Sequence, residues 1–224
     1  MASTVAHNVH FIKVMVDSLP PSAPRLDEPV VRAIVAAAHR GGLKVFAHIG
    51  TSQDALLAAR SGVDVLAHGV YRGRVTPAQA QQLAQFKVPV VYTLSAFVQT
   101  AKLGRGQFVP SALDEATVPA EILKALGGDV GRAFGQKPAL AEFLNALWEN
   151  EPLWPDNVRT LLAAGVPLLI GTDSQLAGLF PGSSFHNELR LLAAAVVASD
   201  ELLYAATGLA ADVLGLDRGR IQPG

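Results

Sequence analysis

Residues 42–69 read GLKVFAHIGTSQDALLAARSGVDVLAHG, and this stretch decides the fold. It contains two short apolar runs, 43–48 and 63–68, separated by a helical segment. Apolar runs that alternate with helices are typical of a parallel sheet, because a parallel connection needs a crossover that is usually helical. Each run ends in Ala-His, so the stretch predicts two neighbouring strands with His48 and His68 at their carboxyl ends.

The same alternation continues on both sides of this stretch. We expect five strands, at 9–16, 43–48, 63–68, 88–94 and 166–171. We expect helices at 27–40, 52–60, 77–86, 155–164, 185–198 and 200–207. The glycine-rich section 95–151 interrupts the pattern and is predicted to be an irregular insertion or lid, with helical pieces near 119–126 and 138–149. The predicted fold is α/β: a partial TIM-barrel-like fold of about five parallel strand–helix units, in one domain over 1–224.

The composition excludes several classes of function. Half of the 224 residues are apolar and 17% are charged, against roughly 25% in an ordinary domain, so most of the chain can bury a core. A net charge of −1 gives no electrostatic reason to bind nucleic acid or an anionic membrane. The absence of cysteine excludes disulfides, thiolate metal sites and cysteine nucleophiles. With no signal peptide and no long apolar run, we expect a cytoplasmic protein without a membrane partner.

Potential metal ligands recur where strands end. His48 and His68 end two strands, and Asp173 follows the strand 166–171 after one residue, Thr172. Because active sites of parallel α/β folds lie at the carboxyl ends of the strands, these three side chains are expected to converge. Imidazole and carboxylate are ordinary ligands of zinc and similar divalent ions. The alternatives are that each histidine is structural or faces solvent, and that Asp173 only caps the next helix.

Lys13 is unusual because it lies inside an apolar run. Alternation along the strand puts Phe11, Lys13 and Met15 on one face. A lysine in a buried strand is costly unless it is paired or neutralised. Carbamylation by CO₂ would convert its amine into a carboxylate that can bridge two metal ions. The alternative is a lysine that reaches solvent at a sheet edge.

The sequence resembles the metal-dependent amidohydrolase superfamily, nearest to imidazolonepropionase-like and Xaa-Pro dipeptidase-like members. The resemblance rests on IKVMVDS, the stretch 42–69, LLIGTDS, and the region from HNELRLLAAAVV to the end of the chain. It implies that the chain supplies the C-terminal part of a (β/α)₈ barrel. Lys13 would be the carboxylated ligand on the fourth barrel strand, and His48 and His68 the ligands on the fifth and sixth. Asp173 on the eighth strand would bind metal and act as general base.

Further residues are candidates for substrate contact. The resemblance implies that His186 and Glu188, in the HNEL motif, support the site or the substrate. Tyr71, Arg72 and Tyr92 lie at or just past strand ends, and Arg72 could hold a substrate carboxylate. The alternative for each is a rim residue without a role.

The chain also departs from the superfamily's pattern. The HxH motif of the first barrel strand is missing; His7 and His10 are three residues apart, whereas ligands on one strand face need an i, i+2 spacing. The chain is expected to begin at the fourth barrel strand and to lack the superfamily's small β-sandwich. One divalent ion, zinc, is therefore expected rather than two. Exposed sheet edges favour a homo-oligomer.

The sequence thus predicts a metal-dependent hydrolase of amide, peptide or related ester bonds in small molecules or short peptides. Metal-activated water would attack the carbonyl, with Asp173 as general base. The alternative is a catalytically impaired amidohydrolase fragment that acts as a non-enzymatic, self-associating module.

Overall fold

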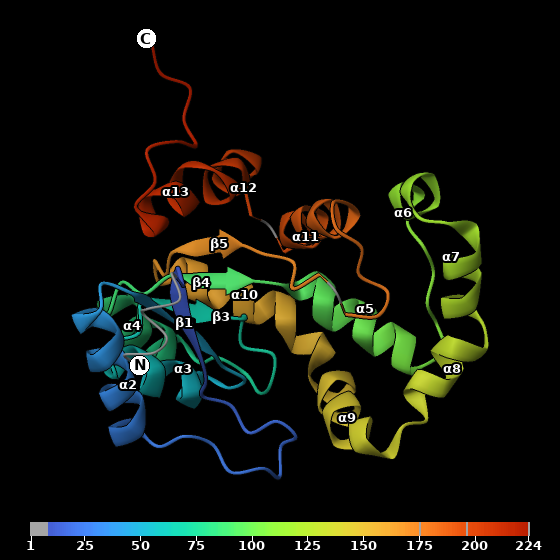
Figure 1. Ribbon diagram of the computed structural model, residues 1–224, viewed down its shortest axis with the longest axis horizontal. Helices are drawn as coiled ribbons and strands as arrows, with labels where there is room; N and C mark the ends of the chain where they lie inside the picture. The colour runs from blue at the N-terminus through green and yellow to red at the C-terminus, as the bar shows by residue number, and fades with distance from the viewer. Residues whose placement is uncertain (1–8, 175, 196, 224) are drawn as a thin grey trace. The chain divides into compact units, whose positions relative to one another are not determined.

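The computed structural model describes residues 9–174, 176–195 and 197–223. It contains a five-stranded sheet in the order β1-β2-β3-β4-β5, so each strand lies beside the next one in the chain (Figure 1). The strands are β1 (Phe11–Met15), β2 (Lys44–His48), β3 (Val65–Ala67), β4 (Val90–Tyr92) and β5 (Leu168–Ile170). The pairings of β1 with β2, β2 with β3 and β3 with β4 are parallel. The predicted α/β fold, an open part of a (β/α) barrel, is confirmed.

Helices connect the strands as the sequence predicts. They are α2 (Glu28–Arg40), α3 (Ser52–Arg60), α4 (Pro77–Gln85) and α10 (Trp154–Ala163). Local signals explain where they begin. Asp27 caps α2 by accepting the N–H of Val30, and capping boxes at Thr51 and Thr76 start α3 and α4.

The chain divides into two compact units. The first comprises 1–91 and 156–168, and the second comprises 92–155 and 169–224, so the boundaries fall within β4, α10 and β5. The core of the first unit packs the apolar sides of its helices on the sheet. Val31, Val35 and Ala38 of α2 are buried, as are Val45 and Ala47 of β2. This packing fixes the strand ends of the first unit, where its polar side chains gather.

The second unit is mostly helical. It contains α5 (Leu94–Gly104), α6 (Ala112–Thr117), α7 (Ala120–Gly127), α8 (Asp129–Gly135), α9 (Ala141–Asn150), α11 (Ser183–Ala194), α12 (Ser199–Ala206) and α13 (Gly208–Leu214). Short 3₁₀ turns at Pro138–Leu140 and Glu151–Leu153 flank α9. Among the described residues, no helix combines the length and apolar character needed to span a membrane.

The expectation that 95–151 is irregular is wrong, because its glycines mark helix ends and close contacts. Gly104, Gly127 and Gly135 each end a helix. Gly135 also lies against Gly104, where a Cβ would collide with the neighbouring backbone. The glycines therefore let α8 approach α5 closely, instead of breaking helical structure.

Candidate functional site

Three strand ends of the first unit deliver polar side chains to one place. His48 is the last residue of β2, and His68 directly follows β3. Asp17 lies two residues beyond the end of β1, where the backbone N–H of Val16 still bonds to the carbonyl of His48 at 2.8 Å. Because these strands are parallel and in register, their carboxyl ends share one edge of the sheet.

Asp17 is the hub of this site. Its side chain is fully buried. Its carboxylate contacts Nε2 of His48 at 3.2 Å, accepts the Tyr71 hydroxyl at 2.6 Å and accepts a charged hydrogen bond from Arg72. Burial alone would raise the pKa of Asp17, but the hydrogen bonds from His48 and Tyr71 and the charge of Arg72 outweigh it and hold this pKa below its usual value. Asp17 is therefore an anion at neutral pH.

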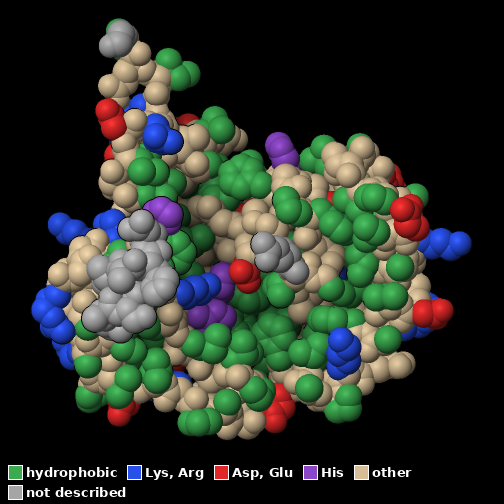
Figure 2. All heavy atoms as spheres, viewed as in Figure 1, with side chains coloured by type: hydrophobic (Ala, Val, Ile, Leu, Met, Phe, Trp, Pro, Cys, Tyr) green, Lys and Arg blue, Asp and Glu red, His purple; other side chains and the backbone are tan. Residues whose placement is uncertain are grey.

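The two strand-end histidines lie edge to face. Their ring centroids are 5.1 Å apart. Figure 2 shows histidine side chains at several places on the visible face, some of them next to one another. Burial lowers the pKa of His68 to about 3, and the positive charges of His48 and Lys13 add to this effect. His68 is therefore neutral at physiological pH. The contact with Asp17 occupies Nε2 of His48 and leaves Nδ1 as the ring nitrogen that can bind a ligand.

The loop after β3 holds Tyr71 and Arg72 in place. The carbonyl of Gly50 accepts the backbone N–H groups of Tyr71 and Arg72, at 3.1 and 2.9 Å. The buried side chain of Asn157, from α10, accepts the N–H of Val75 at 2.8 Å and donates to two carbonyls of the same loop. A fixed loop keeps both side chains directed at Asp17. Burial, followed by the hydrogen bond to Asp17, raises the pKa of Tyr71, so its hydroxyl stays protonated as a donor.

Arg72 lies between two buried carboxylates. Its Nη2 donates to Asp17 and lies 4.0 Å from Oδ2 of Asp54. Asp54 also pairs with Arg25 and caps α3 through Thr51. Since the charge of Arg72 is already balanced inside the protein, the structure favours an orienting role for it; substrate binding by Tyr71 and Arg72 stays a prediction.

Lys13 is not buried, which corrects the expectation of a lysine inside a covered strand. β1 is the first strand in the order of the described sheet, and the side chains of Phe11, Lys13 and Met15 are all exposed. The alternative, a lysine that reaches solvent at a sheet edge, is the arrangement observed. Lys13 is still close enough to His68 to affect its pKa. Because Lys13 is exposed, burial does not explain why its amine would be carbamylated. The carbamylation of Lys13 stays a prediction.

The histidines at the strand ends meet some of the requirements of a site for a divalent cation. A neutral imidazole is the form that binds metal, and a carboxylate on the second ring nitrogen is the usual partner of a metal-bound histidine. His48 with Asp17, and neutral His68, match this chemistry. Within the described part of the chain, however, no group of three or more His, Cys, Asp or Glu residues is placed to hold a metal ion. A third ligand would have to be Lys13 as a carbamate or a residue outside this group.

The remaining predicted residues belong to the second unit. Asp173 is exposed and has a left-handed backbone, with φ +49°. His186 is exposed on α11. Tyr92 ends β4 and is only 2% exposed; within the described chain its hydroxyl has no hydrogen-bond partner. Burial raises the pKa of Tyr92, and the charge of Glu188 raises it further. A shared site of these residues with His48 and His68 stays a prediction, as does the lid role of 95–151.

Glu188 has a role in the second unit that its sequence motif did not reveal. No side chain of α5 itself caps that helix. Instead, the fully buried carboxylate of Glu188 accepts the N–H groups of Leu94 and Ser95, at 2.8 and 2.6 Å. Burial raises the pKa of Glu188 to about 7, against the opposing effect of these hydrogen bonds. Glu188 thus joins α11 to the start of α5.

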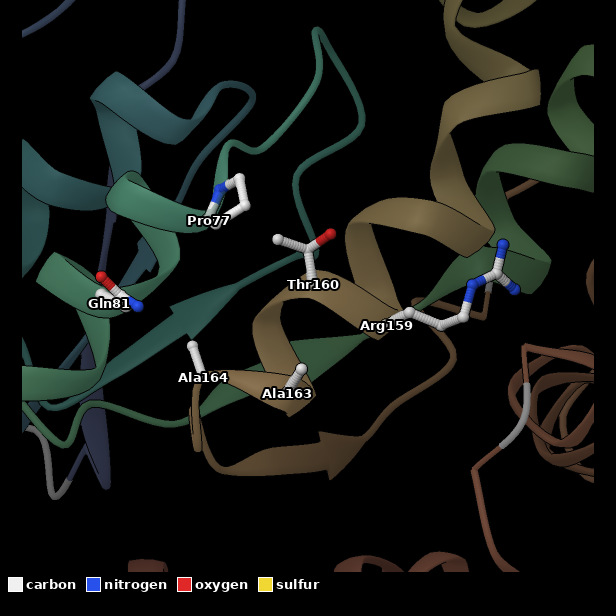
Figure 3. A pocket seen from close by; sticks show the side chains of 6 residues that line it. All are labelled: Pro77, Gln81, Arg159, Thr160, Ala163 and Ala164. Atoms are coloured by element: carbon white, nitrogen blue, oxygen red, sulfur yellow. The ribbon is translucent and has the colours of Figure 1, made fainter.

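The first unit also contains a cavity of about 360 Å³, and none of the candidate site residues named above lines it. It is lined by Pro77 and Gln81 of α4 and by Arg159, Thr160 and Ala163 of α10, with Ala164 beyond (Figure 3). The side chains in Figure 3 include no histidine or carboxylate. We therefore place the candidate site at the strand ends and not in this cavity.

Sequence reasoning missed Asp17, Asp54 and Asn157. A signal for Asp17 was available, since it follows the strand 9–16 much as Asp173 follows 166–171. The roles of Asp54 and Asn157 depend on contacts between distant segments, which no local pattern reveals.

Solved structures of amidohydrolases share this fold. An amidohydrolase has a TM-score of 0.72 and 25% identity, over 99% of this chain and 48% of its own. A prolidase complexed with N-methylphosphonate-L-proline has a TM-score of 0.71 and 22% identity, over 100% and 48%. A Xaa-Pro dipeptidase with bound methionine in its active site has a TM-score of 0.67 and 16% identity, over 98% and 47%. No protein-family model and no curated protein matches the sequence.

The chain spans about half the length of these structures. Its resemblance to the amidohydrolases is therefore confirmed at the level of the fold, as a partial (β/α) barrel.

Proposed function

From this amidohydrolase fold, we propose that the chain serves in a metal-dependent hydrolase of amide or peptide bonds, with small molecules or short peptides as substrates. The fold neighbours that carry a functional name include an amidohydrolase, a prolidase and a Xaa-Pro dipeptidase. The observation that carries the proposal is the pair of strand-end histidines, one buried and neutral and the other oriented by Asp17.

His48 and His68 would hold one divalent cation, for which we propose zinc, with Lys13 as a carbamate for the third ligand. A bound cation of this kind lowers the pKa of water and polarises a carbonyl. Asp17 orients the ring of His48 and keeps the charge of Arg72 at the site. Asp173 is our proposed general base, and Tyr71, Arg72, Tyr92 and His186 are the proposed substrate contacts. The prolidase neighbour makes Xaa-Pro dipeptides the first substrates to test.

The metal content of the purified chain tests this proposal. The chain is prepared without chelator and with bicarbonate, beside a His48→Ala/His68→Ala variant, and metals are quantified by plasma mass spectrometry. We expect close to one equivalent of zinc in the parent chain and none in the double variant. His39→Ala is the matched control, because His39 is an exposed histidine of the first unit whose Nε2 contacts Asp64 at 2.9 Å.

Hydrolysis is measured separately on a panel of Xaa-Pro dipeptides. Activity should disappear with a chelator and return with zinc in the parent chain but not in the double variant. A parent chain that holds no metal would refute the metal-dependent reading. A metal-loaded chain without activity would limit the proposal to metal binding.

A second candidate function is a non-enzymatic, self-associating module. The observation in its favour is the exposed strand β1, on which Phe11 and Met15 are each 47% exposed. A strand at a sheet edge offers unpaired backbone groups and, here, apolar side chains to another chain. This candidate requires association in solution, whereas the hydrolase does not.

A further inference from the structure

The second unit contains a small cavity that the proposed hydrolase does not use. Its volume is about 140 Å³, and it lies between α5 and α11. We call it the α5–α11 cavity. Its polar lining consists of Ser95, Gln99 and Lys102 of α5 and Asn187 and Arg190 of α11, with two aliphatic side chains beside them.

Helical spacing explains why these side chains face one space. Ser95, Gln99 and Lys102 follow each other at i, i+4 and i+7, which places them along one face of α5. Asn187 and Arg190 are three apart on α11. Two rigid helices therefore form both walls of the cavity.

Gln99, one of the residues that line the cavity, carries a buried hydrogen-bond acceptor without a partner among the described residues. Gln99 is only 9% exposed, and in the described chain its Oε1 has no hydrogen-bond partner. A buried polar atom without a partner destabilises the folded chain, because it has given up its hydrogen bonds to water. A ligand that donates a hydrogen bond to Gln99 would remove this cost.

The charges around the cavity are positive. Lys102 and Arg190 both line it, and no carboxylate is found among the described residues of its lining. The guanidinium of Arg190 is held along α11 by Oδ1 of Asn187 at 2.7 Å. Glu188 is the acidic residue nearest in sequence on α11, but its carboxylate is engaged by the N–H groups of Leu94 and Ser95. The site therefore suits an anion.

We propose that the α5–α11 cavity binds hydrogen phosphate. The oxygens of this anion would pair with Lys102 and Arg190, and its remaining hydroxyl would donate to Gln99. A volume of about 140 Å³ exceeds the roughly 30 Å³ share of one water severalfold, so a tetrahedral oxyanion fits. The proposal goes beyond the hydrolase function and does not depend on it.

A comparison of phosphate with sulfate, an ion of the same shape, tests the proposed hydrogen bond from the phosphate hydroxyl to Gln99. Inorganic phosphate keeps at least one hydroxyl at pH 7.5, whereas sulfate and most of a phosphate monoester such as methyl phosphate have none. Calorimetric titrations of the full chain at matched ionic strength should show millimolar binding of phosphate. Sulfate and methyl phosphate should bind about tenfold more weakly, as expected for the loss of one hydrogen bond to a charged ligand.

Variants separate the contributions of charge and hydroxyl. Lys102→Ala and Arg190→Ala should each weaken phosphate binding about tenfold. Gln99→Leu should weaken phosphate and leave sulfate unchanged. Lys124→Ala and Arg132→Ala are the matched controls, because both remove exposed cations elsewhere in the second unit, on α7 and α8.

Two further measurements keep the proposal falsifiable. Titrations in the His48→Ala/His68→Ala background exclude phosphate bound to a metal ion at the other site. In the unaltered chain, phosphate should shift the side-chain amide signal of Gln99 in ¹⁵N–¹H spectra, which requires no variant to fold. Equal binding of phosphate and sulfate, unchanged binding in both cation variants, or an unmoved Gln99 signal would overturn the proposal.

Discussion

At the scale of single residues, Asp17 determines the chemistry of the first unit. A buried carboxylate is costly when it is alone, because burial penalises the charged form. Asp17 avoids that cost through the hydrogen bonds from His48 and Tyr71 and the charge of Arg72, which lower its pKa despite burial. The arrangement is reciprocal, because the same carboxylate orients the ring of His48 and balances Arg72.

Replacement of Asp17 by asparagine should therefore destabilise the chain strongly. Asp17→Asn keeps the shape but leaves the partly buried Arg72 with only the more distant carboxylate of Asp54, and breaking a buried ion pair costs up to about 3–5 kcal/mol. Urea unfolding measures the loss. Asp129→Asn breaks the exposed pair with Arg132 and should cost less than about 1 kcal/mol. Equal stabilities of the two variants would contradict the role of Asp17.

Gly50 provides an independent check on the position of Asp17. A Cβ at Gly50 would lie 2.6 Å from Cγ of Asp17, well inside van der Waals contact. Gly50→Ala should displace the carboxylate and cost about 1–3 kcal/mol, as overpacking of a filled site does. Gly127→Ala is the control, since a Cβ there meets nothing within 4 Å and Gly127 ends α7. Thermal unfolding compares them, and an unchanged Gly50→Ala protein would show that the carboxylate can move freely.

At the scale of elements, α5 depends on α11 for its start. Backbone N–H groups in the first turn of a helix have no partner within the helix, and a carboxylate near them is stabilising. α11 provides that carboxylate through Glu188, since α5 has no capping side chain of its own. The contact also explains why Glu188 can be fully buried: its oxygens are occupied by N–H groups instead of water.

The raised pKa of Glu188 makes this contact sensitive to pH. Because that pKa, about 7, lies above the ordinary value of 4.5, the folded chain binds the proton more tightly than the unfolded chain. The stabilisation is complete below about pH 4.5 and is lost as the pH rises through about 7. The free energy of unfolding should then fall with pH in this window, at most by about 1.4 kcal/mol per unit for one proton.

Glu188→Gln should remove that slope, since an amide does not titrate. At pH 5 it should change the stability little, because the amide, like the protonated carboxyl group, has one carbonyl oxygen to accept a backbone N–H group. Urea unfolding from pH 5 to 7.5 measures both effects, with the exposed Glu149→Gln as control. A variant that keeps the slope of the parent chain would place the titration on another group.

Local sequence patterns were sufficient to predict the sheet, but not the exposure and the long-range contacts of the residues around it. The alternation of apolar runs and caps predicts the strands of the first unit and the positions of His48 and His68, since both depend only on neighbouring residues. The exposure of Lys13 depends on which strand lies at the edge, which the sequence of β1 does not contain. The partners of Asp17 and Glu188 come from residues 31 to 94 positions away, so only the folded chain reveals them.

At the scale of the whole molecule, the sheet order has one consequence for assembly. The strands follow each other in sequence order, so β1 and β5 are the outermost strands of the described sheet. The chain also spans about half the length of the amidohydrolase structures that share its fold. In β1, the exposed face carries Phe11 and Met15. Natural proteins commonly protect such edges with lysine. On the exposed face of β1 one lysine, Lys13, lies between the two apolar side chains.

This edge predicts association between copies of the chain. If β1 mediates it, Phe11→Lys/Met15→Lys should leave the chain monomeric at concentrations where the parent chain associates, because added lysines repel and must be desolvated at an interface. Sedimentation velocity over a concentration series measures this, and thermal unfolding verifies that the variant folds. Leu203→Lys is the control, since Leu203 is 63% exposed on helix α12 of the second unit. A parent chain that is monomeric throughout would exclude the self-associating module, and association that persists in the double variant would assign it to another surface.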